Sequence, residues 1–225
     1  MARADTMPFD RPRKLVFLHI PKTAGTSIEQ ALNLYGPWDQ ENLTTGFGLI
    51  KSRDLLARNL SSNFLQHLRL VELEQLFPEA LEGAQLFTVV RDPWQRLLSS
   101  FRNQDPDLAR YYRYRTHREL SSLNLAGYID LARWLPHPHM RSQFDFLSRM
   151  GSKYSHSRVK VFHQERLEEL ERWLSEYYGE SIRLPHNNPT RQPLPELPNA
   201  ELQALEQQVR WLYAVDNRAF GYMNG

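Results

Sequence analysis

The chain of 225 residues contains no cysteine. This excludes disulfide bonds and thiolate metal sites and fits a reducing compartment. Long apolar runs are also missing: no window approaches the ~18 apolar residues of a membrane-spanning helix. The opening stretch MARADTMPFDRPRK lacks the apolar core of a signal peptide. We therefore expect a cytoplasmic protein; the alternative is a catalytic domain from a larger, membrane-anchored chain.

A strong excess of charge is missing as well. Lys and Arg together number 28 against 26 Asp and Glu, and no basic block interrupts the chain, so nucleic acid is not indicated as a specific partner. The hydrophobic content of 41% is ordinary for a globular protein of this length. We predict a single domain over residues 1–225, with residues 1–13 as a flexible N-terminal segment.

Three short apolar runs alternate with amphipathic segments. KLVFLHI (14–20), QLFTVV (85–90) and RVKVFH (158–163) are each typical of a buried strand. Apolar residues at helical spacing predict helices after these strands, and further helices at 68–77 and from about residue 199. This alternation indicates an α/β fold with a central, mostly parallel sheet flanked by helices.

The sequence HIPKTAGTS (19–27) connects the first strand to its helix. Thr26 and Glu29 fit a capping box at the helix start. Ligands of α/β sheets bind at the carboxyl ends of strands, where helix N-termini attract anions. Lys22 adds a positive charge and Gly25 permits close approach of the backbone. The segment therefore predicts a phosphate site, the alternative being a capped turn with a surface lysine. The Walker A string G-x-x-x-x-G-K-[ST] is absent.

A second strand–helix junction follows at RDPWQRLLSS (91–100). Asp92 is a natural N-cap, with Pro93 at the first helical position. Ser99 lies about two turns along the face of Asp92, where Arg91 could join it at one phosphate. The alternative is an arginine paired with a carboxylate and a serine facing solvent or core. Two anion sites on neighbouring junctions indicate a ligand with two separated phosphates.

Both junctions resemble motifs of known enzymes. HIPKTAGTS is similar to the 5′-phosphosulfate loop of sulfotransferases, and FTVVRDPWQRLLSSF resembles their 3′-phosphate segment. The likeness is greatest to the carbohydrate-type family that includes heparan sulfate O-sulfotransferases and small bacterial members. Weaker likeness continues through HMRSQFDFL, LPHNNPTR and LYAVDNRAFGY. Asp92 departs from the more usual Asn, but it preserves the cap.

The resemblance implies a P-loop-like three-layer fold and the donor 3′-phosphoadenosine 5′-phosphosulfate (PAPS), with 3′,5′-ADP as product. It places Arg91 and Ser99 on the 3′-phosphate and, more loosely, Thr190 and Arg191 over the same group. It implies that the 5′-phosphosulfate is held by the loop residues Lys22, Thr23, Ala24, Gly25, Thr26 and Ser27. A sulfuryl group carries less charge than a γ-phosphoryl group, so Lys22 and aligned amides could stabilise the leaving group without a metal.

Transfer to a hydroxyl requires a proton acceptor, and histidine suits neutral pH. The resemblance implies that His67 is this base, because related carbohydrate enzymes carry a histidine between the two motifs. His19 is the second candidate, with packing at the strand end as its alternative role. His137 and His139 in the HPH sequence have no third metal ligand at recognisable spacing, so no metal site is predicted.

The acceptor is expected to be a hydroxyl compound, most simply a saccharide. Residues 102–125 have too little apolar periodicity for core and predict a polar, aromatic loop. Its Tyr111–Arg118 part could stack sugars and pair acidic groups, the alternative being a solvated loop. The candidate acceptor contacts are Arg102, Tyr112, Arg115, Arg141 and Gln143.

Two other functions stay open at this point. One is a phosphotransferase with an atypical phosphate loop, which would consume ATP with Mg²⁺. The other is a non-catalytic module that binds saccharides or polyanions. The sequence indicates neither the acceptor's identity nor an oligomeric state.

Overall fold

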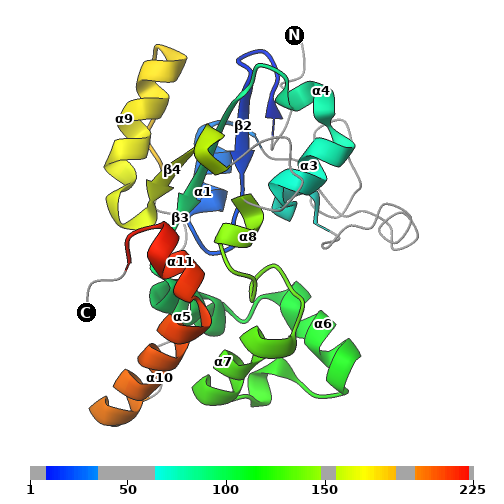
Figure 1. The fold of residues 1–225 in the computed structure, drawn as a ribbon, viewed down its shortest axis with the longest axis vertical. Helices are drawn as coiled ribbons and strands as arrows, with labels where there is room; N and C mark the ends of the chain where they lie inside the picture. The colour runs from blue at the N-terminus through cyan, green and yellow to red at the C-terminus, as the bar shows by residue number, and fades with distance from the viewer. Residues whose placement is uncertain (1–8, 35–63, 148–155, 186–195, 223–225) are drawn as a thin grey trace. The chain divides into compact units, whose positions relative to one another are not determined.

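The computed structural model describes residues 9–34, 64–147, 156–185 and 196–222 (Figure 1). These residues fall into two compact units, between which the chain crosses at Val90, Phe144 and Asn187. Unit 1 comprises Met1–Val90 and Asp145–Asn187, and unit 2 comprises Arg91–Phe144 and Asn188–Gly225. No shift in composition along the sequence marks this division, and a single domain over the whole chain stays a prediction.

Unit 1 is built on a four-stranded sheet of order β1-β2-β3-β4 (Figure 1). Its strands are β1 (Phe9–Asp10), β2 (Leu15–Leu18), β3 (Gln85–Val90) and β4 (Val159–His163). β2 pairs in parallel with β3, β3 pairs in parallel with β4, and β1 is antiparallel to β2. The predicted α/β class and mostly parallel sheet are therefore confirmed. Parallel pairing also brings the carboxyl ends of β2 and β3 to the same edge.

Two helices pack on one face of this sheet. Helix α1 (Gly25–Ala31) contributes Ile28 to a buried cluster that includes Phe17 and Phe87 of the strands. Helix α9 (Leu167–Tyr178) contributes Leu170 and Leu174 to the same cluster and ends at Gly179, whose φ is 70°. The predicted helix over 167–178 is confirmed. The other helical segments of unit 1 are η1 (Leu65–His67), α3 (Leu70–Leu76), α4 (Pro78–Leu81), η3 (His156–Arg158) and η4 (Gln164–Arg166).

The beginning of the chain differs from the prediction of a flexible segment over residues 1–13. Phe9 and Asp10 form a buried edge strand, and the ring of Phe9 packs edge-on against Phe77 at 4.9 Å between centroids. The hydroxyl of Tyr178 donates to the Asp10 carboxylate at 2.7 Å. The prediction is wrong for residues 9–13 because these side chains anchor the segment to the sheet; residues 1–8 lie outside the described residues.

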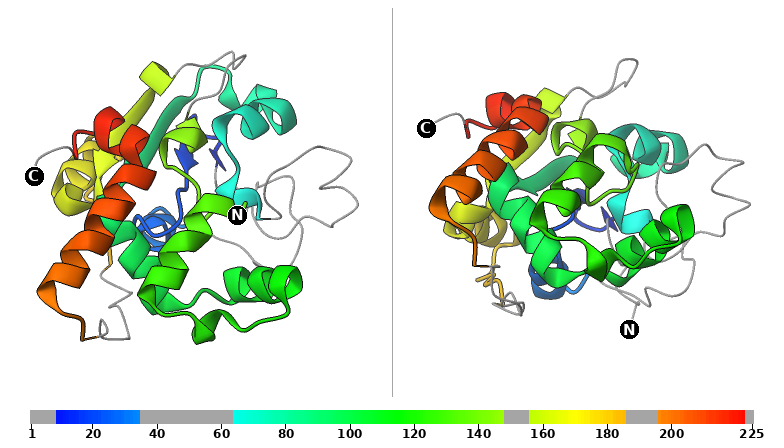
Figure 2. Two further views of the ribbon diagram at one scale, coloured as in Figure 1. Left: turned by 60° about the horizontal axis from the view of Figure 1, so that its bottom comes forward. Right: turned by 90° about the horizontal axis from the view of Figure 1, so that it is seen from below.

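Unit 2 is helical in its described residues. Its helices are α5 (Pro93–Asn103), α6 (Pro106–Thr116), η2 (Leu120–Ser122), α7 (Leu125–Trp134), α10 (Asn199–Leu212) and α11 (Ala214–Ala219). Helix α8 (Phe144–Leu147) begins where the chain leaves this unit. Helix α10 packs against both α5 and α7 (Figure 2). Its start at Asn199 confirms the predicted last helix.

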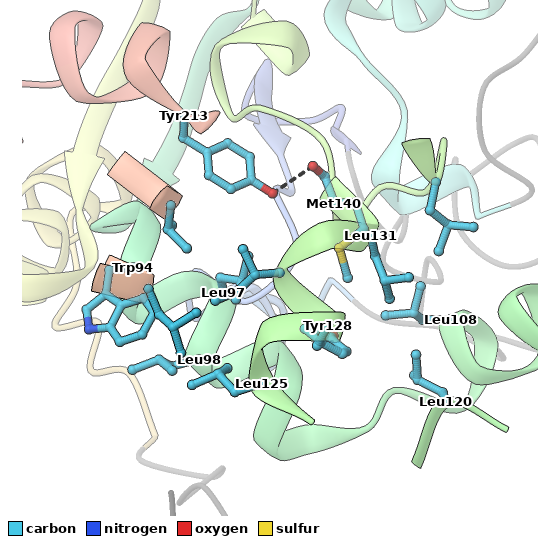
Figure 3. Packing of buried hydrophobic residues seen from close by; sticks show 14 of the residues in the cluster. Trp94, Leu97, Leu98, Leu108, Leu120, Leu125, Tyr128, Leu131, Met140 and Tyr213 are labelled. Atoms are coloured by element: carbon cyan, nitrogen blue, oxygen red, sulfur yellow. Dashed lines mark hydrogen bonds between the residues drawn. The ribbon is translucent and has the colours of Figure 1, made fainter. Parts of the chain in front are cut away.

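The core of unit 2 gathers apolar side chains from four helices. Leu97 of α5, Tyr128 of α7 and Val209 of α10 are all buried in one cluster. Figure 3 shows this packing, with the hydroxyl of Tyr213 donating to the Met140 carbonyl oxygen at 2.8 Å. Burial raises the pKa of the Tyr213 phenol to about 12, so this donor keeps its proton at any ordinary pH.

Helix α6 occupies a segment that the sequence predicted to be a loop. Asp105 caps it by accepting from the amides of Asp107 and Leu108 at 3.0 and 3.2 Å, with Pro106 at the first helical position. Leu108 and Tyr112, four residues apart, are buried in the core of unit 2. The prediction was wrong because two apolar contacts suffice to bury one face of so polar a helix.

Candidate functional site

The loop between β2 and α1 has an unusual backbone. Lys22 and Ala24 have φ values of 70° and 71°, in the left-handed region that side chains disfavour. Ala24 is the N-cap residue of α1, and within the described residues no side chain caps this helix. The first amides of a helix lack partners inside the helix. The loop therefore leads into a helix start without a side-chain cap, where the Ser27 N–H bonds to the Ala24 carbonyl at 3.0 Å.

The predicted capping box at this helix is wrong. The helix starts at Gly25, so Thr26 lies inside its first turn and is exposed. The carboxylate of Glu29 is buried and meets the ring of His19 at 2.6 Å between Oε1 and Nδ1. This pairing takes Glu29 away from the capping role that its spacing from Thr26 suggested.

The loop's hydroxyl groups are placed differently from one another. Thr23 is fully buried, and its hydroxyl donates to the Ile20 carbonyl oxygen at 2.8 Å. A phosphate contact from Thr23 would therefore have to come from its backbone amide. Lys22 and Ser27 are half-buried, and Thr26 is exposed. An ammonium, two hydroxyls and helix-start amides form a donor set suited to an anion.

Gly25 lies against the ring of His19. A Cβ atom built on Gly25 would come within 1.9 Å of His19 Nε2, far inside van der Waals contact. The ring of Phe17 also stacks on this imidazole, at 5.5 Å between centroids. Gly25 is therefore required by the imidazole that packs on it, in addition to the close anion approach that the sequence indicated.

His67, the predicted base, lies beside the same residue although 48 positions separate the two in the chain. Its Nδ1 lies 3.1 Å from the carbonyl oxygen of His19, and its ring packs edge-on against the His19 ring at 4.6 Å between centroids. A carbonyl oxygen can only accept, so Nδ1 carries the proton and a neutral ring has its lone pair on Nε2. Both predicted histidine candidates thus meet at the start of the loop.

The β3–α5 junction is organised by side chains of unit 2. The amide of Gln143 accepts from the backbone N–H of Arg91 at 2.9 Å and donates to the Arg91 carbonyl at 2.8 Å. Asp216 in turn accepts from the backbone N–H groups of Gln143 and Phe144 at 2.8 and 2.9 Å, and from the Ser142 hydroxyl. The backbone conformation of Arg91 is therefore set by two buried polar residues.

Helix α5 begins as the sequence predicted. The Asp92 carboxylate accepts from the Gln95 amide at 3.0 Å, and Pro93 is the first helical residue. The same carboxylate pairs with Arg210 of α10 at 3.3 Å. Arg91 and Ser99 are both half-buried. Their shared contact with a phosphate stays a prediction.

Two of the predicted acceptor contacts have other roles. Tyr112 is buried at 4% exposure in the core of unit 2, with its ring tilted against Trp134. Gln143 is fully buried, and both ends of its amide are engaged with Arg91. In this conformation neither side chain can reach a bound acceptor.

The remaining predicted residues are less constrained. Arg115 is exposed, and Arg102 and Arg141 are half-buried. The Arg141 carbonyl accepts from the buried guanidinium of Arg96 at 2.9 Å; burial lowers the pKa of Arg96, and three carbonyl oxygens surround its N–H groups. Thr190 and Arg191 lie outside the described residues.

The two histidines of the HPH sequence contact carboxylates. His137 Nε2 lies 3.2 Å from Asp107, and His139 Nε2 lies 3.8 Å from Asp105. His139 Nδ1 also meets the Ser100 hydroxyl at 3.0 Å. Among the described residues, no group of three or more His, Asp or Glu side chains could hold a metal ion.

The sequence analysis missed Glu29 and Asp216 as site residues. Glu29 fitted a capping pattern and was assigned to it. Asp216 sits in YAVDNRAF, where it is followed by Asn217 and Arg218, so the local sequence gives no signal of a buried carboxylate. Its partners, residues 142–144, are more than 70 positions away in the chain.

A comparison with protein families matches residues 5–223 to the sulfotransferase family. Searches of curated proteins and of solved structures found no match. No helix in the described part of the chain is long and apolar enough to cross a membrane. Because the family match covers nearly the whole chain, including both strand–helix junctions, the protein belongs to the sulfotransferase family and its general chemistry is sulfuryl transfer.

Proposed function

We propose that the protein transfers the sulfuryl group of PAPS to a hydroxyl of a saccharide, with His67 as the base. The observation that carries this proposal is the position of His67 at the start of the Lys22 loop, with Nδ1 on the His19 carbonyl. Family membership supports the reaction class, and the order of the two junction motifs supports PAPS as donor. We also assign the P-loop-like three-layer fold on the strength of this membership.

The donor fits the residues present. The loop from Lys22 to Ser27, with its uncapped helix start, would hold the 5′-phosphosulfate. Arg91 and Ser99 would hold the 3′-phosphate, and Thr190 and Arg191 are assigned to the same group from the sequence alone. This donor set supplies positive charge and N–H groups, which suit two anionic ends of one nucleotide.

The proposed reaction is an in-line displacement. The acceptor oxygen forms a bond to sulfur while its proton passes to the lone pair on His67 Nε2. The bond from sulfur to the bridging oxygen breaks, and 3′,5′-ADP departs with the electron pair. The Lys22 ammonium stabilises the charge that develops on that oxygen, so we expect no metal requirement.

The exposed face of α6 supports an acidic saccharide as acceptor. Tyr114 is 77% exposed, and the neighbouring Arg113 and Arg115 are exposed as well. An exposed tyrosine offers a flat face for a sugar ring, and arginine pairs with carboxylate or sulfate groups. Tyr114 therefore replaces the buried Tyr112 as the aromatic candidate, while Arg115 is retained.

Calorimetry with 3′,5′-ADP and 5′-AMP tests the donor. We expect 3′,5′-ADP to bind at least tenfold more tightly, because the 3′-phosphate adds charge-assisted hydrogen bonds. Equal affinities would contradict the assignment. Transfer of radiolabelled sulfate from PAPS to saccharides, lipids and small alcohols then identifies the acceptor class; ATP consumption that depends on Mg²⁺, without sulfate transfer, would indicate a phosphotransferase instead.

A further inference from the structure

Glu29 is a buried carboxylate to which neither helix capping nor donor binding assigns a role. We propose that Glu29 and His19 form a positioning pair that holds the ring of His67 in the orientation required for proton transfer. This inference rests on the proposed function, because it concerns the same base. Three contacts within unit 1 carry it.

The first contact joins Glu29 to His19. Their side chains are only 8% and 10% exposed, and Oε1 lies 2.6 Å from Nδ1. An ionised carboxylate accepts only, so the imidazole Nδ1 donates. A charge-assisted hydrogen bond of this kind is short and strong, and it satisfies a carboxylate that would be costly to bury alone. Glu29 therefore fixes the rotation of the His19 ring.

The second contact sets the position of that ring. The imidazole is packed between the stacked ring of Phe17 and the backbone of Gly25, where a Cβ would come within 1.9 Å of Nε2. The ring has no room to tilt without displacing the residue that opens α1. The pair thus connects Glu29, the fifth residue of α1, to His19, which directly follows β2.

The third contact joins the fixed His19 residue to the ring of His67. Its ring is held by two parts of one residue: the His19 carbonyl accepts from Nδ1 at 3.1 Å, and the His19 ring lies edge-on at 4.6 Å. The hydrogen bond selects the tautomer with the lone pair on Nε2, and the ring contact restricts the orientation of the His67 ring. Loss of Glu29 releases the His19 ring, and with it one of the two contacts that orient His67.

This role makes a specific kinetic prediction. Glu29 acts through other residues and does not contact either substrate, so its loss changes kcat and leaves donor binding nearly intact. We expect Glu29→Leu to lower kcat by about 30- to 300-fold with KM for PAPS changed less than threefold. Glu29→Gln keeps an oxygen that accepts from Nδ1 but removes the charge, and should lower kcat by about 3- to 10-fold.

The experiment combines these kinetics with ¹⁵N NMR of the histidine rings, assigned by loss of signals in His67→Gln. The wild-type protein should show the His67 proton on Nδ1, whereas Glu29→Leu should shift and broaden the His67 ring signals, because the His19 ring no longer restricts the His67 ring. Ile28→Val is the matched control: Ile28 is buried in the same helix, so the variant loses packing while the Glu29–His19 pair remains. It should keep kcat and the wild-type ring signals.

Wild-type kcat together with unchanged His67 signals in a folded Glu29→Leu protein would overturn the proposal. Should Glu29→Leu not fold, Glu29→Gln decides by the same two readouts. The ring signals are measured without substrate, so they report positioning separately from the reaction. A protein that shows the predicted ring signals yet binds 3′,5′-ADP no better than 5′-AMP would contradict the proposed function, while leaving the contacts of Glu29, His19 and His67 in place.

Discussion

The two strand–helix junctions of this protein differ in how the first amides of the helix are capped. At β3–α5, Asp92 caps the helix with its own carboxylate and Pro93 removes one amide that would need a partner. At β2–α1, the N-cap is Ala24 in a left-handed conformation, and no described side chain covers the helix start. The first junction is closed by its own side chain, whereas the second has no side-chain cap and bonds the Ser27 N–H to the Ala24 carbonyl at 3.0 Å. A helix start without a side-chain cap costs stability, which agrees with our proposal that this loop binds the donor.

Removal of the Lys22 charge should have the largest effect. We expect Lys22→Ala to lower kcat by roughly 10²- to 10³-fold, because charge on the departing oxygen loses its main cation. The measurement is sulfate transfer under saturating PAPS. Lys14 provides a matched control, since it also has a positive φ, of 52°, but lies in the turn before β2. Equal losses in Lys14→Ala and Lys22→Ala would remove the catalytic assignment.

Arg91 should affect binding more than turnover. We expect Arg91→Ala to weaken 3′,5′-ADP binding by about 10- to 100-fold while 5′-AMP binding stays the same, because the guanidinium is assigned to the 3′-phosphate. Calorimetry with both nucleotides measures the difference. Arg172, an exposed arginine of α9, serves as the charge-matched control. An equal loss of affinity for both nucleotides would contradict the assignment of Arg91 to the 3′-phosphate.

We expect loss of the Asp92 cap at α5 to lower the stability of the fold. Asp92→Ala removes both the hydrogen bond to Gln95 and the pair with Arg210, and should lower the free energy of unfolding by about 1–2 kcal/mol. Asp92→Asn keeps the cap and should cost less than half as much. Urea unfolding of the three proteins gives the comparison. If the alanine variant were as stable as wild type, the cap would contribute nothing measurable.

The smallest effect is expected at Ala24. Glycine adopts a positive φ without the Cβ penalty, so Ala24→Gly should raise the free energy of unfolding by up to about 1 kcal/mol, offset in part by greater freedom of the unfolded chain. Thermal unfolding of the protein without nucleotide measures this. A clear loss of stability would mean that the Ala24 methyl group makes a contact worth more than the strain.

The positions of several strands and helices could be predicted from the sequence, because they depend on residues close together in the chain. Apolar runs located β2, β3 and β4, and the Asp-Pro pair located the start of α5. Local signals also misled: Thr26 and Glu29 have capping-box spacing, yet Glu29 pairs with His19 across the junction. That pairing depends on how closely the ring approaches Gly25, a distance that spacing along the chain does not encode.

Helix α6 and the role of Gln143 could not be predicted, because both depend on tertiary packing. Leu108 and Tyr112 are two apolar residues in a polar stretch, and their burial depends on partners supplied by α5 and α7. Gln143 looked like a polar residue suited to an acceptor, but its amide serves the backbone of Arg91. Which polar side chains face a ligand and which face the protein is decided by tertiary packing, after the elements have formed.

The hydrogen bonds of Asp216 have a consequence for how the protein is made. Asp216 orients Gln143, which fixes the backbone of Arg91, and it follows both Arg91 and the Lys22 loop by more than a hundred residues in the chain. Chains emerge from their N-terminal end, so the Lys22 loop and its sheet partner β3 are synthesised long before the residue that completes the Arg91 junction. A nascent chain in which Asp216 is not yet synthesised would therefore contain the Lys22 loop but lack the side chain that orders the backbone at Arg91.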